Sequence, residues 1–287
     1  MEETGKGVEF KGERLEFKGK DMKAEIITIG DELLIGQVVD TNSAWMAQRL
    51  NEYGIVLHQI TSVHDDRQHI LTAIDEAFGH ADIVLTTGGL GPTKDDITKQ
   101  VLCECFNTSL VEDTRVREHI YSWYKERPDV LNRLTATQWL VPKSATILPN
   151  RVGSAPIMVF EKEVIGMGKK LLVAMPGMPH EMQIAMTEQV LPYLANILYP
   201  QGGTPADYGT RIVHRSIKVR GIAESTLAIH IEDWENALPD NIRLAYLPKD
   251  GTITLRLSGY GVTTEMVEEQ LEKLRSLVYD YEVSHEE

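Results

Sequence analysis

The stretch that decides the fold runs from Thr86 to Asp96 and reads Thr86-Thr87-Gly88-Gly89-Leu90-Gly91-Pro92-Thr93-Lys94-Asp95-Asp96. It follows the apolar residues 83–86, which predict a buried strand, and it leads into residues 95–106, which predict a helix. Three glycines in a strand-to-helix turn allow the backbone to approach a ligand without side-chain clashes. Backbone amides and the helix dipole at such a turn favour an anion such as phosphate.

Three charged residues follow the glycines. Lys94 would add a positive charge to an anion site, whereas Asp95 and Asp96 would repel a phosphate unless a cation lay between them. A divalent metal ion bound by the two carboxylates would remove this repulsion and would also activate water. The alternative is structural, because Thr93 and Asp96 have the spacing of a capping box, in which Asp96 only caps the helix.

Strands and helices alternate on both sides of this stretch. Continuously apolar strands that alternate with helices are typical of a parallel sheet covered on both faces, so we predict an α/β domain of three layers with a mostly parallel sheet. The predicted strands are residues 25–29, 55–63, 83–86, 146–148 and 171–174, with 157–160 as an antiparallel addition. The predicted helices are residues 43–53 with Asn42 as N-cap, a segment through 70–78, and residues 95–106, 117–125 and 180–198.

The chain divides into three parts. Residues 1–23 are charged and glycine-rich and contain Glu-Phe-Lys-Gly twice, which predicts a flexible N-terminal extension or an added edge hairpin. Residues 24–200 form the α/β domain, and the segment from Tyr199 to Pro205 has the proline and glycine content of a linker. Residues 206–287 predict a small α+β domain, with strands at 211–219, 243–247 and 252–258 and helices at 223–237 and 264–281.

Polar residues follow other predicted strands at the same edge of the sheet, where doubly wound folds bind ligands. Asp31 and Glu32 would take a ribose hydroxyl or a metal-bound water, and Asn42 would contact a base or a phosphate; solvated loop carboxylates and a helix cap are the alternative. Glu181 begins a helix, where a carboxylate also complements the dipole. The further candidate binding residues are Thr87, Gly88, Gly89, Gly91, Thr93, Asn132, Arg133, Gly153, Ser154 and Gly177.

Composition excludes several classes of protein. Of 287 residues, 29 are Lys or Arg and 43 are Asp or Glu, which gives a net charge of −14. This excess argues against nonspecific binding to nucleic acid or to an anionic membrane. The two cysteines, Cys103 and Cys105, exclude a disulfide scaffold and a cysteine-based zinc site. No apolar run approaches the roughly 18–20 residues of a membrane span, and the N-terminus lacks the apolar segment of a signal peptide, so we expect a cytoplasmic protein.

Three motifs together resemble those of the CinA family of competence/damage-inducible proteins, whose main domain is like the molybdopterin-binding domains. The motifs are Gly30-Asp31-Glu32-Leu33-Leu34-Ile35-Gly36 with Asp40-Thr41-Asn42, the stretch from Thr86 to Asp96, and Pro176-Gly177-Met178-Pro179-His180-Glu181-Met182. The resemblance covers about residues 24–260. The segments 221–225 and 249–256 look like the small domain that follows in CinA proteins.

The resemblance implies an ADP-ribose pyrophosphatase that needs a divalent metal ion (Mg²⁺ or Co²⁺) and potassium and works as a homodimer. It would split ADP-ribose into AMP and ribose 5-phosphate. Asp95 and Asp96, with a possible contribution from Asp31, would hold the metal ion, the amides of residues 88–91 would contact the phosphates, and Asp31 or Glu32 would orient the attacking water. Many CinA proteins carry a further deamidase domain, which we expect this chain, ending at Glu287, to be too short to contain.

Two alternatives remain open. One is another enzyme of the same fold that acts on molybdopterin or on a dinucleotide such as FAD. The other is a nucleotide-binding regulator without catalytic activity. The acidic pair favours catalysis, because the binding of a phosphate does not require two additional carboxylates.

Overall fold

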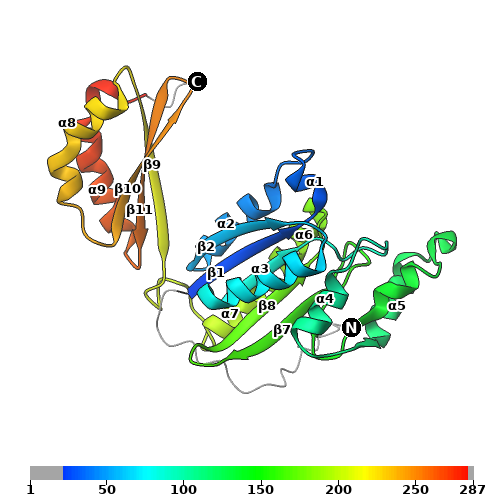
Figure 1. The fold of residues 1–287 in the computed structure, drawn as a ribbon. Helices are drawn as coiled ribbons and strands as arrows, with labels where there is room; N and C mark the ends of the chain where they lie inside the picture. Colours follow the sequence, from blue (N-terminus) through cyan, green and yellow to red (C-terminus); the bar gives the residue numbers. More distant parts are fainter. Residues whose placement is uncertain (1–21, 284–287) are drawn as a thin grey trace, which may run out of the picture.

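The computed structural model describes residues 22–283 (Figure 1). The predicted N-terminal extension lies outside the described residues, except that Met22 and Lys23 already belong to the first strand. A six-stranded sheet with the order β2-β1-β3-β8-β7-β6 forms the centre of the larger domain. Its parallel strands are β2 (Ile55–Val63), β1 (Met22–Ile29), β3 (Ile83–Thr87) and β8 (Gly168–Met175). Antiparallel pairing joins β7 (Ile157–Val164) to β8 and to β6 (Thr146–Leu148).

Helices cover both faces of this sheet, which confirms the three-layer prediction (Figure 1). One face packs against α2 (Thr41–Glu52), α6 (Pro179–Ala185) and α7 (Leu191–Leu198). The other face packs against α3 (Arg67–His80) and α4 (Thr98–Cys105). The sheet is apolar on both sides, as its unbroken runs of Ile, Val and Leu require.

The single helix predicted over residues 180–198 is in fact two α-helices joined by a π-helical turn, Met186–Val190. Pro192 stands at the start of α7 and explains the interruption. Proline lacks an N–H group, and its ring crowds the carbonyl four residues earlier, so regular α-helical bonding cannot pass through it.

Two predicted helix starts are wrong. Asp40, and not Asn42, is the N-cap of α2, because its carboxylate accepts from the Ser43 amide at 2.9 Å. The helix predicted from residue 95 begins only at Thr98. Aspartate at an N-cap position accepts amides that have no partner inside the helix, and Asp66 and Asp113 do the same for α3 and for α5 (Thr114–Trp123).

A side layer lies beyond α4. It contains the strand pair β4 (Leu110–Glu112) and β5 (Leu140–Pro142), with α5 packed against it through Val116, Ile120 and Val141. The helix predicted over residues 117–125 is therefore α5, which begins and ends slightly earlier. Short 3₁₀ turns at Pro128–Val130 and Thr135–Trp139 connect this layer, and the single-turn helix α1 (Asp31–Leu34) follows β1.

The small domain has an antiparallel sheet with two helices, which confirms the α+β prediction. Its strands lie in the order β10 (Ile242–Lys249), β11 (Thr252–Tyr260) and β9 (Ile212–Arg220), and its helices are α8 (Glu224–Asn236) and α9 (Thr264–Leu277). Helix α9 packs on this sheet through the buried residues Val267, Leu271 and Leu274. Met266 and Leu277 lie at the borders of this apolar face and are 42% and 40% exposed.

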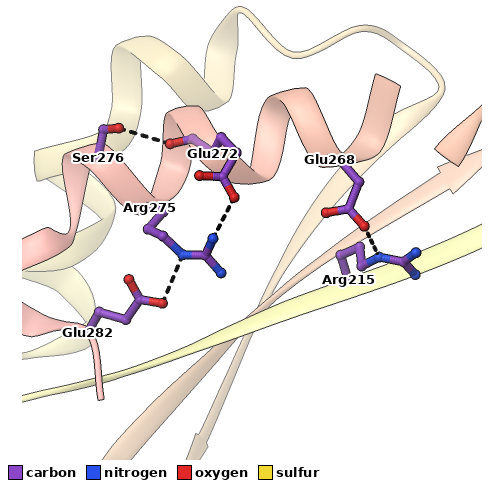
Figure 2. A network of polar contacts seen from close by, with 6 residues as sticks. All are labelled: Arg215, Glu268, Glu272, Arg275, Ser276 and Glu282. Atoms are coloured by element: carbon purple, nitrogen blue, oxygen red, sulfur yellow. Dashed lines mark hydrogen bonds and ion pairs between the residues drawn. The ribbon is translucent and has the colours of Figure 1, made fainter. Parts of the chain in front are cut away.

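Ion pairs join α9 to β9 and to the segment that follows α9. Arg275 bonds Glu272 and also Glu282, the latter at 3.0 Å, and Arg215 of β9 bonds Glu268 (Figure 2). Each carboxylate of this group has an arginine as its partner.

The segment between the domains is tied to the larger one. The Tyr199 hydroxyl donates to the Tyr53 carbonyl at 2.6 Å and lies 3.1 Å from the Thr210 hydroxyl. Within residues 22–283 no helix combines the length and the apolar character that crossing a membrane requires.

Candidate functional site

A cavity of about 570 Å³ lies at the carboxyl edge of the large sheet. Gly30 follows β1, Gly88 follows β3 and Gly177 follows β8, and all three line it. This is the position at which parallel α/β sheets bind ligands. The structure thus brings together eleven of the predicted residues: Glu32, Asn42, Thr87, Gly88, Gly89, Gly91, Asp95, Asp96, Ser154, Gly177 and Glu181.

The glycine turn is held close to the end of β1. Gly88 has φ +114°, and a Cβ atom on it would lie 2.0 Å from the Ile29 carbonyl oxygen. Gly89 has φ +62°, and its Cβ would lie 2.1 Å from the Thr98 hydroxyl. Only glycine fits these positions without moving the backbone.

Residues 88–91 were expected to offer four amides to a phosphate, but two of these amides already donate hydrogen bonds within the protein. Gly88 N donates to the Met175 carbonyl at 3.2 Å, and Gly91 N donates to Asp96 at 2.7 Å. Among the described residues the amides of Gly89 and Leu90 have no acceptor. These two are the donors that remain for an anion.

Asp96 organises the turn, whereas Asp95 is exposed. The Asp96 carboxylate accepts from the Gly91 and Thr93 amides at 2.7 and 2.9 Å. The bond from the Thr93 amide to Asp96 is one that a capping box contains. However, the next helix begins only at Thr98, so the interpretation that Asp96 merely caps a helix is wrong. The Thr93 hydroxyl lies 2.5 Å from both aspartates, and this bond lowers the pKa of Asp95.

Asp65 lines the cavity, although it was not predicted from the sequence as a site residue. It follows β2, accepts from the Asp31 amide at 3.3 Å, and lies close enough to Gly89 that a Cβ there would be 3.2 Å from its carboxylate. Burial raises its pKa, and the nearby carboxylates of Asp31, Glu32 and Asp96 raise it further. The sequence could have indicated this residue, because Asp65 lies two positions after the predicted strand 55–63, at the same edge of the sheet.

Asn42 lies inside α2 and connects two motifs. Its side-chain amide donates to the Gly177 carbonyl at 2.8 Å and to the Thr87 hydroxyl at 3.4 Å. Its carbonyl oxygen Oδ1 is buried without a hydrogen-bond partner. An unsatisfied buried acceptor costs roughly 1–3 kcal/mol, so a donor from a ligand is the natural partner for this atom.

Glu181 is fixed at the opposite wall of the cavity. It accepts from the Asn150 side chain at 2.5 Å, and burial raises its pKa. Gly153 packs directly on this carboxylate, since a Cβ there would lie 1.8 Å from Glu181 Oε1. The glycine therefore makes room for Glu181 and does not itself line the cavity.

Six of the predicted residues do not line the cavity: Asp31, Thr93, Lys94, Asn132, Arg133 and Gly153. Asp31 bonds His64 Nδ1 at 2.7 Å instead. Asn132 accepts from the amides of Leu134 and Thr135 and so forms its own local turn. Lys94 and Arg133 are exposed.

A buried lysine supports the turn from behind. Lys99 donates to the carbonyls of Thr137 and Leu140 at 2.9 and 3.3 Å and to the Gln138 side chain at 3.3 Å. Gln138 in turn donates to the Leu90 carbonyl at 3.0 Å. Burial lowers the pKa of Lys99 to about 8, although the nearby Asp96 opposes this shift.

The charges that face the cavity are all of one sign. Among the described residues that line it, none is Lys or Arg. The acidic ones come from five different segments: Glu32, Asp40, Asp65, Asp95, Asp96 and Glu181. Such an arrangement disfavours an anionic ligand unless a cation accompanies it.

The donor chemistry fits Mg²⁺ or a similar hard ion, which prefers carboxylate and phosphate oxygens. Within the described residues, the carboxylates of the cavity do not bring three ligand atoms within 4.8 Å of one another. This also fits Mg²⁺, which is usually held by one or two carboxylates together with substrate phosphates and not by a complete protein cage.

Comparison with known proteins agrees with this architecture. Residues 25–196 match the family described as "Probable molybdopterin binding domain", and residues 214–281 match "Damage-inducible protein CinA KH domain". A CinA-like protein of Flavobacterium psychrophilum is 40% identical over 274 residues, which are 93% of this chain and 62% of the relative. A putative competence-damage inducible protein of Clostridium beijerinckii is 36% identical over 85% of this chain and 56% of its own length.

A solved structure gives the same result for the larger domain. The crystal structure of the protein CinA from Thermoplasma acidophilum is 28% identical with a TM-score of 0.53, and the match covers 61% of this chain and 99% of that one. The present chain spans somewhat more than half the length of the curated relatives it matches.

Proposed function

This chain belongs to the CinA family, and from that premise we propose that its cavity binds ADP-ribose and hydrolyses the pyrophosphate bond with the help of a divalent metal ion. The observation that carries the proposal is the cavity itself. Six acidic residues and no Lys or Arg surround a glycine turn that offers two amides. A pyrophosphate accompanied by a metal ion fits both features, whereas a neutral ligand would leave the negative charge of the carboxylates uncompensated.

Asp95 and Asp96 are the residues that would hold the ion, which would supply the positive charge that a pyrophosphate needs beside carboxylates. The exposed position of Asp95 suits this role, and Asp96 retains lone pairs beyond its bonds to the turn. The amides of Gly89 and Leu90 donate to the phosphate oxygens. Asn42 Oδ1 accepts from a ribose hydroxyl or a base amine.

Hydrolysis requires a base near the attacking water. Asp65 and Glu32 both line the cavity, whereas Asp31 is engaged with His64. The raised pKa of Asp65 favours this residue as the proton acceptor. Water attacks one phosphorus atom, its proton passes to Asp65, and the bond to the bridging oxygen breaks to release AMP and ribose 5-phosphate.

The test is incubation of the purified protein with ADP-ribose, FAD and a molybdopterin-type substrate, each with and without Mg²⁺ or Co²⁺. We expect metal-dependent formation of AMP and ribose 5-phosphate from ADP-ribose. Turnover of FAD or of the pterin alone would assign one of the other enzymes of this fold. Binding without any product would support a regulator.

Asp95→Asn and Asp96→Asn locate the activity. Removal of a residue that only hydrogen-bonds to a metal ligand lowers activity about 10–100-fold. Asp95 and Asp96 would be ligands themselves, so we expect each variant to lose more activity than that. If both variants retained full metal-dependent turnover, the role of the acidic pair would be wrong.

We also propose, as the family resemblance implies, that the active form is a homodimer and that potassium increases turnover. Light scattering tests the first point, and replacement of K⁺ by Na⁺ in the assay tests the second. We do not expect the small domain to clamp nucleic acid. The glycine-x-x-glycine loop with which KH domains clamp a nucleic-acid backbone does not occur in residues 214–281, which contain more acidic than basic residues.

A further inference from the structure

A second group of metal-ligating side chains lies away from the cavity. Glu25 of β1, His58 of β2 and His80 at the end of α3 offer ligand atoms that all lie within 4.8 Å of one another. His80 Nδ1 is 3.1 Å and His58 Nε2 is 3.9 Å from the same oxygen, Glu25 Oε1. Glu25 precedes Gly30 by five residues of extended strand, which is roughly 16 Å, so this group is separate from the cavity.

An irregularity of the sheet brings the three residues together. The parallel pairing of β1 with β2 shifts between Ala24, which pairs with Leu57, and Glu25, which pairs with Gln59. His58 is therefore an additional residue of β2, and it lies beside Glu25. Bulges are rare between parallel strands, and they commonly redirect a side chain. This bulge turns an imidazole toward a buried carboxylate.

The carboxylate needs a compensating charge. The Glu25 side chain is only 2% exposed, and the charged form of a buried carboxylate is costly without a partner. Among the described residues, its side chain has His58 and His80 as its partners. An imidazole compensates the charge only when it is protonated, whereas a metal ion compensates it while both imidazoles remain neutral.

We propose that Glu25, His58 and His80 bind a Zn²⁺ ion, with water as the fourth ligand. Two imidazole nitrogens and one carboxylate oxygen suit zinc, and they differ from the oxygen-only donors of the cavity, which suit Mg²⁺. Ligand atoms around a tetrahedral zinc ion lie about 3.4 Å apart, so this group must contract slightly. The histidine side chains are 41% and 50% exposed, and they are therefore free to turn toward the buried carboxylate.

A zinc ion at this position would join β1, β2 and α3 at the end of the sheet opposite the cavity. It would bind the folded chain and not the unfolded one, and so it would raise the stability of the larger domain. It would take no part in hydrolysis at the other edge.

Isothermal titration calorimetry with Zn²⁺, in excess Mg²⁺ to occupy the oxygen-only cavity, tests the site directly. We expect one Zn²⁺ per wild-type chain and loss of this binding in the double variant His58→Gln/His80→Gln. His230→Gln is the matched control, because His230 is an exposed histidine of the small domain, and it should bind Zn²⁺ as the wild type does. Equal Zn²⁺ binding by the double variant, or none by the wild type, would overturn the proposal.

Two further measurements test the site even if the double variant misfolds. His80→Gln alone changes a half-exposed side chain at the end of a helix, and it should weaken Zn²⁺ binding by more than about tenfold. Zn²⁺ should raise the melting temperature of the wild type and of His230→Gln, but not that of His80→Gln. An equal rise in all three proteins would place the ion elsewhere. Mg²⁺-dependent turnover of ADP-ribose should be the same in all of them, which separates this proposal from that for the cavity.

Discussion

The two domains use carboxylates in opposite ways. In the small domain several carboxylates on and after α9 pair with basic side chains, as Glu272 and Glu282 do with Arg275 (Figure 2) and Glu269 does with Lys273. Around the cavity of the larger domain, carboxylates from five segments converge without a Lys or Arg among the lining residues. Paired surface charges are nearly neutral in their effect on stability, whereas unpaired converging charges destabilise the fold. This difference supports our proposal that a cation enters the cavity together with the ligand.

Some of these cavity carboxylates also hold the backbone in place. Asp40 caps α2, and Asp96 accepts two amides of the glycine turn. Such charge-assisted bonds offset part of the repulsion. Asp65 differs, since burial and three neighbouring carboxylates raise its pKa. Replacement of Asp65 should therefore show most clearly a gain in stability together with a loss of activity.

The largest expected effect comes from the glycine turn. Gly88→Ala places a Cβ atom 2.0 Å from the Ile29 carbonyl at a φ of +114°, so we expect a loss of about 3 kcal/mol in the free energy of unfolding together with loss of ADP-ribose turnover. Gly166→Ala is the matched control, because φ is +77° there and nothing lies within 4 Å. It should cost only about 1 kcal/mol and leave turnover unchanged. Urea denaturation measures both values, and equal losses would refute the tight packing of the turn.

Asp65→Asn should have effects of opposite sign on activity and stability. Turnover in the wild type should rise as the pH increases through the raised pKa of Asp65, and the variant should lose this dependence and at least about 100-fold in rate. A carboxyl whose pKa is raised on folding stabilises the protein below its unfolded pKa of 3.8, and this stability is lost as the pH rises through the folded pKa. The variant should therefore be more stable than the wild type at neutral pH, by less than about 1 kcal/mol because solvent screens the charge.

Urea denaturation at pH 7 and below pH 3.8 checks the sign of this change. The stability gain should be present at the higher pH and absent at the lower one. A variant that is less stable at pH 7 would mean that Asp65 is compensated within the protein.

The smallest effect is expected in the small domain. Arg275→Ala removes two ion pairs at the surface, of which the one to Glu282 is partly buried, and should lower the free energy of unfolding by less than about 1 kcal/mol, with no change in turnover. High salt should lower the wild-type stability toward that of the variant. A loss of several kcal/mol would show that Arg275 does more than pair with charges at the surface.

The strands of the larger domain were predictable from sequence because their apolar runs are continuous. The antiparallel segment at residues 157–160 and the strand at 55–63 appear as β7 and β2. Helix starts were less predictable, because several side chains compete for the same amides. Asp40 took the cap expected of Asn42, and Asp96 bonded the turn without starting a helix.

The cavity was partly predictable for a similar reason. Residues that directly follow a strand, such as Gly88 and Gly177, reach the sheet edge by topology alone. Lys94 and Arg133 were predicted to belong to the site, but both are exposed, because their positions depend on loop conformations that sequence patterns do not encode. The bulge at His58 depends on the register of two strands, which composition does not reveal.

The central proposal is that a metal ion held by Asp95 and Asp96 strengthens the binding of a phosphate ligand in the cavity. Calorimetric titration with ADP, in the presence and absence of Mg²⁺, tests it in the wild type and in Asp95→Asn. We predict that Mg²⁺ tightens ADP binding to the wild type by at least about tenfold, or 1.4 kcal/mol. In the variant Mg²⁺ should have little effect, and binding without metal should be no weaker than in the wild type. Equal ADP affinity of the wild type with and without Mg²⁺ would contradict the claim.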